Sequence, residues 1–439
     1  MTVTWGMAAG SGNHAVATTY TKALVAHVLR RTTFGPFPGQ VNTWAAKGVA
    51  ATITHVLAAP ALPVADWATM TATDDGSDLP VRWWLKRMAN PAAGIHEKMT
   101  FFWHGHLTTG HDKVYRWKCE VPQHVLIRRY ALGNTRTLIQ KLTVDPAMLL
   151  YLDGSWSVAD TPNENYAREL MELFCLGRGT VASPNYHQAD VEAAAKALAG
   201  YGVDWDTGIA AYYPDNALPL DQTVHFLGRD VRTAAQVVDA VLGHKAAAPW
   251  IAGRLWRYLV GKEPSTAKRA TLGRLLVYNK WAVKPVVTAI LHDPLFLTSR
   301  MNRPRQPIEW VTAAMAALGL TDAAHPDLRL ETLWTLGQLP FYPPNVAGWP
   351  WGLRWLGPGL TLAKAAFEVE APAIASVANA ADPVAAALTR CSLFEVSTAT
   401  RAAMHKVVAS PALAGSANKG RRAQLLLALA VGSPEFALA

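Results

Sequence analysis

Apolar residues recur at spacings of three and four along most of this chain, and no other feature restricts its fold as strongly. Such spacing gathers the apolar side chains of a segment on one face of an α-helix. The segments in which it is clearest are 20–29, 40–57, 81–88, 95–106, 122–132, 135–142, 161–176, 188–200, 234–242, 250–260, 267–277, 285–291, 309–317 and much of 363–437. Glycine and proline, which break helices, stand between many of them. The pattern predicts an all-α fold, a mainly helical multi-helix globular domain.

Three stretches depart from the helical pattern. Residues 201–227 are richer in Tyr, Val and Thr, with a turn-like Pro-Asp-Asn in the middle, and predict a small β-hairpin. Residues 338–362 are rich in Pro, Gly and Trp and predict irregular backbone. Residues 1–18 are small, polar and aperiodic, which predicts a flexible N-terminus. We expect residues 19–439 to form one large helical domain, or two subdomains meeting near residue 228.

The composition excludes several classes of protein. Of the 439 residues 51% are hydrophobic, which supplies a large core and argues against disorder. The net charge of +9 is spread without a run of five basic residues, so we expect no nucleic-acid partner. The three cysteines, Cys119, Cys175 and Cys391, lie far apart in the sequence, which argues against a disulfide framework and against a thiolate zinc site. No leader and no long apolar run are visible, so we expect no membrane span and a cytoplasmic location, although removal of a leader would leave the same sequence.

Residues 161–172 form the first candidate site segment. Thr161 suits a helix N-cap, Pro162 the first helical position and Glu164 the third, which together make a capping box. On the resulting helix one face is apolar, and the opposite face carries Glu164, Arg168 and Glu172, with Asn165 and Glu169 beside them. A solvated ladder of ion pairs explains that polar face. The alternative is a polar face turned inward, toward a metal or a substrate.

Residues 96–111 contain several histidines beside aromatic residues. On a helix Glu97, Phe101 and His104 share one face, and Gly105 is expected to end or kink the helix so that His104 and His106 converge in a turn. Two histidines with a carboxylate suit a divalent metal such as iron, zinc or manganese. Histidines satisfied within a core explain the same pattern without a metal.

Residues 337–355 are the third candidate segment. Trp349, Trp351 and Trp355 could stack on a sugar or an aromatic substrate, and Asn345 could offer hydrogen bonds. Pockets are typically apolar with a few placed polar groups. The alternative is a rigid loop that fills the core.

Several segments together resemble a bacterial family catalogued only as a domain of unknown function, number eighteen hundred. The matching segments are His27–Gly35, Lys98–His106, Asp145–Asp153, Pro162–Leu173, Phe226–Gly228, Ile251–Trp256 and Pro343–Pro350. The resemblance implies that the histidine pair and the Asn-Glu-Asn helix are family features, which favours an inward-facing site.

This chain also departs from the pattern associated with that family. Where a His-Asp pair and a Lys usually precede Phe-Leu-Gly, it has Pro219-Leu220 and Val224, and His187 replaces an expected Thr. If the His-Asp pair is catalytic in relatives, the activity is lost or changed here. Many relatives also look secreted, whereas this sequence shows no leader.

Three functions remain open from the sequence. The first is a metal-dependent enzyme, with oxidative chemistry slightly favoured over hydrolysis, acting on a small organic or sugar-like molecule. His104, His106 and Glu169 would hold the metal, and Glu164, Arg168 and Glu172 would be catalytic. Substrate binding falls to Asn163, Asn165, Asn345, Trp349 and Trp351. The second is a metal-free glycoside hydrolase using Glu164 with Glu172, or Asp153 with Glu169. The third is a non-catalytic binding or scaffold protein.

Overall fold

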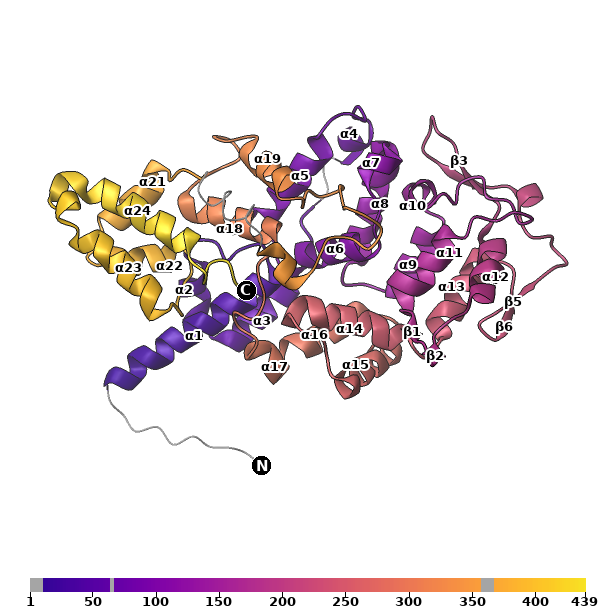
Figure 1. The fold of residues 1–439 in the computed structure, drawn as a ribbon, viewed down its shortest axis with the longest axis horizontal. Coiled ribbons are helices and arrows are strands. Elements are labelled where there is room, and N and C mark those ends of the chain that lie inside the picture. The colour runs from indigo at the N-terminus through magenta and orange to yellow at the C-terminus, as the bar shows by residue number, and fades with distance from the viewer. Residues whose placement is uncertain (1–10, 64–66, 357–366) are drawn as a thin grey trace. The chain divides into compact units, whose positions relative to one another are not determined.

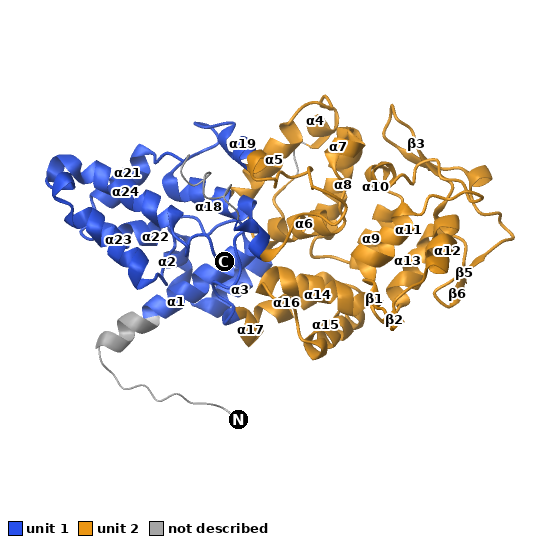
Figure 2. Ribbon diagram, in the orientation of Figure 1, with its two compact units in different colours: residues 1–59, 297–332, 353–439 blue, residues 60–296, 333–352 orange. Residues whose placement is uncertain are grey.

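The structure, a computed structural model, describes residues 11–63, 67–356 and 367–439, with side chains from residue 18 onward. Helices dominate it and the strands are few and short (Figure 1), which confirms the all-α prediction. The chain divides into two compact units (Figure 2). Unit 1 comprises Met1–Ala59, Leu297–Thr332 and Leu353–Ala439, and unit 2 comprises Pro60–Phe296 and Leu333–Gly352. Residue 228, where we expected subdomains to meet, lies inside unit 2.

Unit 1 is helical throughout its described part. Its elements are α1 (Ser11–Thr32), α2 (Gln40–Ala45), α3 (Val49–Ala58), α18 (Pro307–Leu318), α21 (Ala371–Ala378), α22 (Pro383–Arg390), α23 (Thr398–Ala409), α24 (Lys419–Gly432) and the 3-10 turns η4 (Pro411–Leu413) and η5 (Ser416–Asn418). Helix α24 is contacted by α18, α21, α22 and α23, and α1 by α2 and α3. Three elements cross a unit boundary: α17 (Pro294–Leu297), α19 (Leu328–Thr335) and the 3-10 turn η3 (Gly352–Trp355).

Unit 2 contains all the described strands and the candidate segments, except residues 353–355, which belong to unit 1. Its helices are α4 (Trp67–Thr71), α5 (Leu79–Met88), α6 (Ile95–His106), α7 (His111–Val114), α8 (Trp117–Tyr130), α9 (Thr135–Thr143), α10 (Pro146–Tyr151), α11 (Asn165–Glu169), the π-helical turn η1 (Leu170–Cys175), α12 (Gln188–Leu198), the 3-10 turn η2 (Pro214–Asn216), α13 (Ala234–Gly243), α14 (Ala247–Val260), α15 (Thr266–Tyr278) and α16 (Val283–Leu291). Helix α8 is contacted by α4, α6, α9 and α10, while α14 is contacted by α13, α15, α16 and η1.

Most predicted helices occur, with shifts that have identifiable causes. Helix α6 has the predicted bounds, and it continues through Gly105 as an α-helix, so the predicted break there is wrong. The segment predicted as one helix from residue 40 to 57 is two helices, because Gly48 adopts a positive φ of 90° between them. Helix α1 begins at Ser11, within the stretch predicted to be flexible, and residues 1–10 lie outside the described part.

The predicted β structure between residues 201 and 227 is confirmed, and it consists of two hairpins rather than one. Strands β3 (Tyr201–Val203) and β4 (Ala210–Tyr212) pair antiparallel, as do β5 (Val224–Phe226) and β6 (Arg229–Val231). A third small hairpin pairs β1 (Gly179–Thr180) with β2 (Ser183–Pro184).

A buried ion pair lies in the core of unit 2. Glu97 on α6 is 1% exposed, and its two carboxylate oxygens accept hydrogen bonds from both terminal nitrogens of Arg128 on α8. The Glu97 carboxylate also accepts from the indole of Trp84, at 3.3 Å. The bidentate geometry offsets the cost of removing both charges from water.

The irregular stretch predicted for residues 338–362 is confirmed over its described part, which ends at residue 356 and contains only the short turn η3. None of the described helices has the length and apolar character needed to cross a bilayer.

Replacing Glu97 with Gln is expected to reduce the free energy of unfolding by about 3 kcal/mol or more, because Arg128 then keeps a buried charge without its counterion. Urea denaturation followed by circular dichroism measures the change. Asp78→Asn is the matched control, since it breaks the exposed pair with Arg82 and should cost at most about 1 kcal/mol. Equal losses in the two variants would contradict this account of the core.

Candidate functional site

The polar segment predicted around residue 164 lies where an α-helix changes into a π-helix. After α11 the backbone widens into η1, and the N–H of Leu176 donates to the carbonyl of Met171, five residues earlier, at 2.8 Å. Single π-helical turns are frequent at functional sites. The turn ends at Gly177, whose φ is 69° and where a Cβ atom would lie 2.5 Å from the ring of Trp250. The Trp250 indole also donates to the carbonyl of Leu173 at 3.1 Å, so α14 holds the π turn in place.

The predicted capping box at the start of this helix is wrong. The helix begins at Asn165 rather than after Thr161, and the side chain of Glu164 makes no capping bond. Thr161 instead forms an isolated β-bridge with Val158. The Asn163 side-chain oxygen accepts from the backbone N–H of Asn165 at 2.8 Å. Glu164 is therefore available for side-chain contacts.

We define the carboxylate face as the side chains of Glu164, Arg168, Glu169 and Glu172, which lie on α11 and η1. At its first end the Arg168 guanidinium donates to Glu164 at 2.7 Å and to the side-chain oxygen of Gln188 at 3.0 Å. The amide of Gln188 donates in turn to Glu164, at 3.0 Å. Glu164 and Arg168 remain 34% and 40% exposed, so a ligand can reach this network from solvent.

At the other end of the face, the pKa values of two carboxyl groups are shifted in opposite directions. Burial alone would raise the pKa of Glu172, but hydrogen bonds from Arg178, at 2.7 Å, and from the Tyr186 hydroxyl, at 2.9 Å, outweigh it and lower that pKa. Burial and the nearby charge of Glu172 raise the pKa of Glu169. Near neutral pH the face thus pairs an acid that holds its proton more tightly with a base that stays ionised.

The two histidines lie in the core and bind backbone groups. The Nε2 atom of His104 accepts a hydrogen bond from the N–H of Phe341 at 3.0 Å, so that nitrogen carries no proton. The Nε2 atom of His106 lies 2.9 Å from the carbonyl oxygen of Phe174 and donates to it. Burial lowers the pKa of each histidine to about 3, with the charge of Arg254 adding to the effect at His106. Both imidazoles are neutral in the folded protein.

The two predicted site segments do meet, but the predicted metal ligands do not come together. The contact runs from His106 to a backbone carbonyl of η1, whereas Glu169 belongs to the partly exposed carboxylate face. A metal would also have to displace the Phe341 N–H from His104 Nε2. Across the described ranges, no three His, Cys, Asp or Glu side chains are grouped so that they could hold a metal ion. His104, His106 and Glu169 therefore do not fit a shared divalent metal.

The tryptophans of the irregular loop are packed rather than displayed. Trp349 stacks on Phe101 with a centroid distance of 5.2 Å, and Trp351 lies beneath the guanidinium of Arg257 at 5.0 Å. Asn345 accepts from the N–H of Ala347 in a tight turn. These contacts agree with the alternative that the loop fills the core. Trp349 and Trp351 are half-buried, whereas Trp355 is buried and belongs to unit 1.

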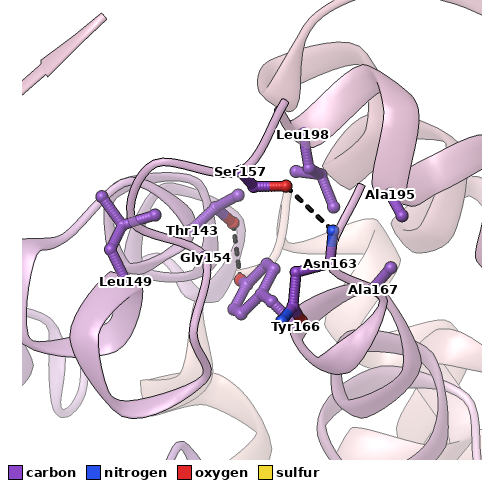
Figure 3. A pocket seen from close by; sticks show the side chains of 9 residues that line it. All are labelled: Thr143, Leu149, Gly154, Ser157, Asn163, Tyr166, Ala167, Ala195 and Leu198. Atoms are coloured by element: carbon purple, nitrogen blue, oxygen red, sulfur yellow. Dashed lines mark hydrogen bonds between the residues drawn. The ribbon is translucent and has the colours of Figure 1, made fainter. Parts of the chain in front are cut away.

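A small cavity adjoins the start of α11 (Figure 3). Its lining residues are Thr143, Leu149, Gly154, Ser157, Asn163, Tyr166, Ala167, Ala195 and Leu198, and it leaves about 10 Å³ for the centre of a water-sized molecule. That space holds at most about one water molecule. A hydrogen bond between the hydroxyls of Thr143 and Tyr166 and one from the Asn163 N–H to Ser157 close its walls. A substrate must therefore approach the carboxylate face from outside.

A second titratable cluster was not predicted from the sequence. His111 bonds through Nδ1 to Glu120 and stacks on Trp117 with a centroid distance of 3.7 Å. The Asp145 carboxylate accepts from Gln123 at 2.7 Å. Burial raises the pKa of Glu120 and that of Asp145 to about 7. Burial would lower the pKa of His111, but the bond to Glu120 outweighs it and raises that pKa.

The sequence does hold a signal for this cluster. Glu120, Gln123, His124 and Ile127 follow the spacing of a buried helix face, yet three of the four are polar, and all four are buried on α8. Polar residues on an apolar face indicate a buried network. Both ring nitrogens of His124 are buried without a hydrogen-bond partner, and its ring packs on Trp84 at 4.2 Å.

Comparison with known proteins yields one match. The model of a family described as "Protein of unknown function (DUF1800)" matches residues 27–438. No curated protein and no solved structure matches the chain.

The free energy of unfolding is expected to fall as the pH rises from about 5 to 8. The folded state holds protons on Glu120 and Asp145 that the unfolded chain releases near its ordinary carboxyl pKa, so this stability is present at low pH and is lost through about pH 7. The raised pKa of His111 acts in the same direction. Each such proton contributes a slope of up to about 1.4 kcal/mol per pH unit.

Denaturation in urea at a series of pH values measures this slope. Glu120→Gln should flatten it, whereas Asp221→Asn, at an exposed position, should leave it unchanged. A slope that is the same in the wild type and in Glu120→Gln would show that Glu120 keeps no extra proton on folding.

Proposed function

Because the chain belongs to the DUF1800 family, whose function is unknown, we propose from its geometry that it is a metal-free hydrolase of glycosidic bonds in a sugar-like substrate. Glu169 acts as the general acid and Glu172 as the general base. Of the three functions left open by the sequence, this one matches the contacts of the carboxylate face best.

The opposite pKa shifts of Glu169 and Glu172 carry this proposal. Glycoside hydrolysis uses two carboxyl groups in different protonation states, one to protonate the leaving oxygen and one to act on the other reactant. When their surroundings push the pKa values of two neighbouring carboxyl groups apart, the group with the higher pKa is the acid and the group with the lower pKa is the base. Hydrogen bonds from Arg178 and Tyr186 lower the pKa of Glu172, while burial and the charge of Glu172 raise the pKa of Glu169.

The reaction balances with these two groups and one water. The Glu169 carboxyl gives its proton to the glycosidic oxygen as the bond from that oxygen to the anomeric carbon breaks. Glu172 takes a proton from the water that attacks the same carbon. Transfer of one proton from Glu172 to Glu169 through solvent then restores both groups, and one water has been added across the bond.

The remaining residues of the predicted site would bind and orient the substrate. Arg168 and Glu164 hold each other and Gln188 in a partly exposed network that presents both donors and acceptors to hydroxyl groups. Asn163 and Asn165 lie at the start of the same helix, and the Asn165 amide donates to Asp153 at 3.1 Å. Glu164 is thus a binding residue in this proposal rather than an acid or a base.

The metal-dependent oxidoreductase favoured by the sequence is less well supported, because its proposed ligands already bind backbone groups or lie apart. A non-catalytic binding role is the second candidate. It is favoured by the hydrogen bonds that Glu164 and Glu172 already make within the protein, since such bonds also serve to fix the fold. The cytoplasmic location expected from the sequence stays a prediction.

Replacing Glu169 or Glu172 with Gln is expected to lower the rate of glycoside hydrolysis about 10²–10⁴-fold, as is usual for loss of a general acid or base. The measurement is release of reducing ends from uncharged oligosaccharides in the presence of EDTA. Glu331→Gln, at an exposed position on α19, is the matched control and should keep the wild-type rate. Activity that EDTA abolishes would contradict the metal-free mechanism.

The pH profile provides a separate test of the two roles. Activity should fall at high pH as Glu169 loses its proton, and at low pH as the Glu172 carboxylate gains one. Glu169→Gln should remove the high-pH limb from the residual activity, and Glu172→Gln the low-pH limb. Profiles with both limbs unmoved in both variants would assign the acid and the base to other residues.

A further inference from the structure

An exposed indole lies on strained backbone in the loop that precedes α11 in the chain. Trp156 is 53% exposed, and its φ is 64°, in the left-handed region that disfavours a bulky side chain. Asp153, three residues earlier, also has a positive φ, of 56°. Strain of this kind persists only where the surrounding structure maintains it, and it concentrates at functional sites.

The Trp156 ring packs against a hairpin, where it is tilted by 40° to the ring of Tyr213. Its backbone N–H donates to the carbonyl of Tyr201 at 2.7 Å, next to the β3–β4 pairing. A Cβ atom on Gly202 would lie 3.0 Å from the Trp156 ring and 2.8 Å from that of Tyr213, so glycine makes room for both. The two rings are 4.7 Å apart. We define the aromatic platform as Trp156 and Tyr213.

Polar groups suited to hydroxyls border the platform. The Asp153 carboxylate is 48% exposed and accepts from Lys113 at 2.8 Å and from Asn165 at 3.1 Å. The Ser157 hydroxyl accepts from the N–H of Asn163 at 2.9 Å. The loop that carries Trp156 is therefore bonded on both sides of the indole to the first residues of the carboxylate face segment.

Charge indicates what kind of ligand the platform takes. Residues 201–223, which include the hairpin, contain four Asp and no Lys or Arg, although the whole chain carries a net charge of +9. This segment itself therefore offers no cation to a phosphate- or sulfate-bearing polymer. The nearby basic side chains are already paired, Lys113 with Asp153 and Arg116 with Asp75. A second indole on the β3–β4 turn, Trp205, is 48% exposed, with the guanidinium of Arg116 over its ring at 4.0 Å. Exposed aromatic rings whose neighbouring cations are paired with carboxylates suit a ligand that has apolar faces, many hydroxyls and no charge.

We propose that the aromatic platform is a binding subsite for an uncharged pyranose oligosaccharide, with one sugar ring stacked on Trp156 and its hydroxyls bonded to Asp153 and Asn165. As the substrate class of the carboxylate face, this deepens the proposed function and rests on it. As a binding site, it stands on the geometry of the platform alone.

Titration of the full chain with cello-, xylo-, manno- and maltohexaose, followed by calorimetry and tryptophan fluorescence, tests the proposal. At least one hexaose should bind to the wild type, and Trp156→Ala should weaken that binding about tenfold or more. Trp334→Ala removes an indole of similar exposure elsewhere in the chain and should leave the affinity unchanged. Gly202→Ala, which keeps every aromatic side chain but takes the space under the platform, should also weaken binding.

Three results would overturn the platform: no hexaose binds, Trp156→Ala and Gly202→Ala bind as tightly as the wild type, or a sulfated or phosphorylated polymer binds better than the neutral sugars. Circular dichroism shows whether both variants fold. If Trp156→Ala does not fold, Gly202→Ala alone decides the test. The Glu169→Gln variant separates the two proposals. Hexaose binding without hydrolysis in the wild type would contradict the enzyme and leave the platform supported.

Discussion

The hydrogen bond from His106 to the carbonyl of Phe174 ties the π-helical turn to α6. The turn also packs on α13 and α14, its side chains Leu170, Met171, Phe174 and Cys175 are buried, and Glu169 and Glu172 are left partly exposed. Burial lowers the pKa of His106 to about 3, so the imidazole stays neutral and the bond is kept at any ordinary pH. Gly177, which admits the ring of Trp250, fixes the other end of the turn.

The sequence predicted the helices well but not the partners of the side chains on them. Periodicity gave the bounds of α6 correctly because its helix face is continuous, and it placed on one face Glu97, Phe101 and His104, all of which are buried in the structure. It could not reveal that His104 bonds to Phe341, 237 residues away, and this contact decides that the imidazole is structural. The polar face around Glu164 was predictable as well, and its partly exposed ion pairs agree with the solvated alternative rather than with the inward-facing one that the family resemblance favoured.

Local signals failed where tertiary contacts competed with them. Thr161 and Pro162 form a strong helix start in sequence terms, yet Thr161 bridges to Val158, and the helix begins only at Asn165. The π turn leaves no mark in the apolar pattern, because one widened turn shifts the period over too few residues. Opposite pKa shifts at Glu169 and Glu172 depend on Arg178 and Tyr186, whose approach no spacing rule predicts.

Tryptophan density proved a poor guide to which aromatic rings are displayed. Trp349 and Trp351 stand in the densest Trp-Pro segment, and both are covered by neighbours, because irregular backbone rich in large rings is held together by packing. Trp156 is isolated in the sequence, and it is exposed because Gly202 and a left-handed backbone hold its ring on the surface of a hairpin. A ring that is covered by its own loop has little apolar area left for a ligand. A ring that the backbone holds on the surface exposes apolar area that a ligand can cover. Backbone strain and exposure therefore locate the proposed binding site better than the local density of tryptophan in the sequence does.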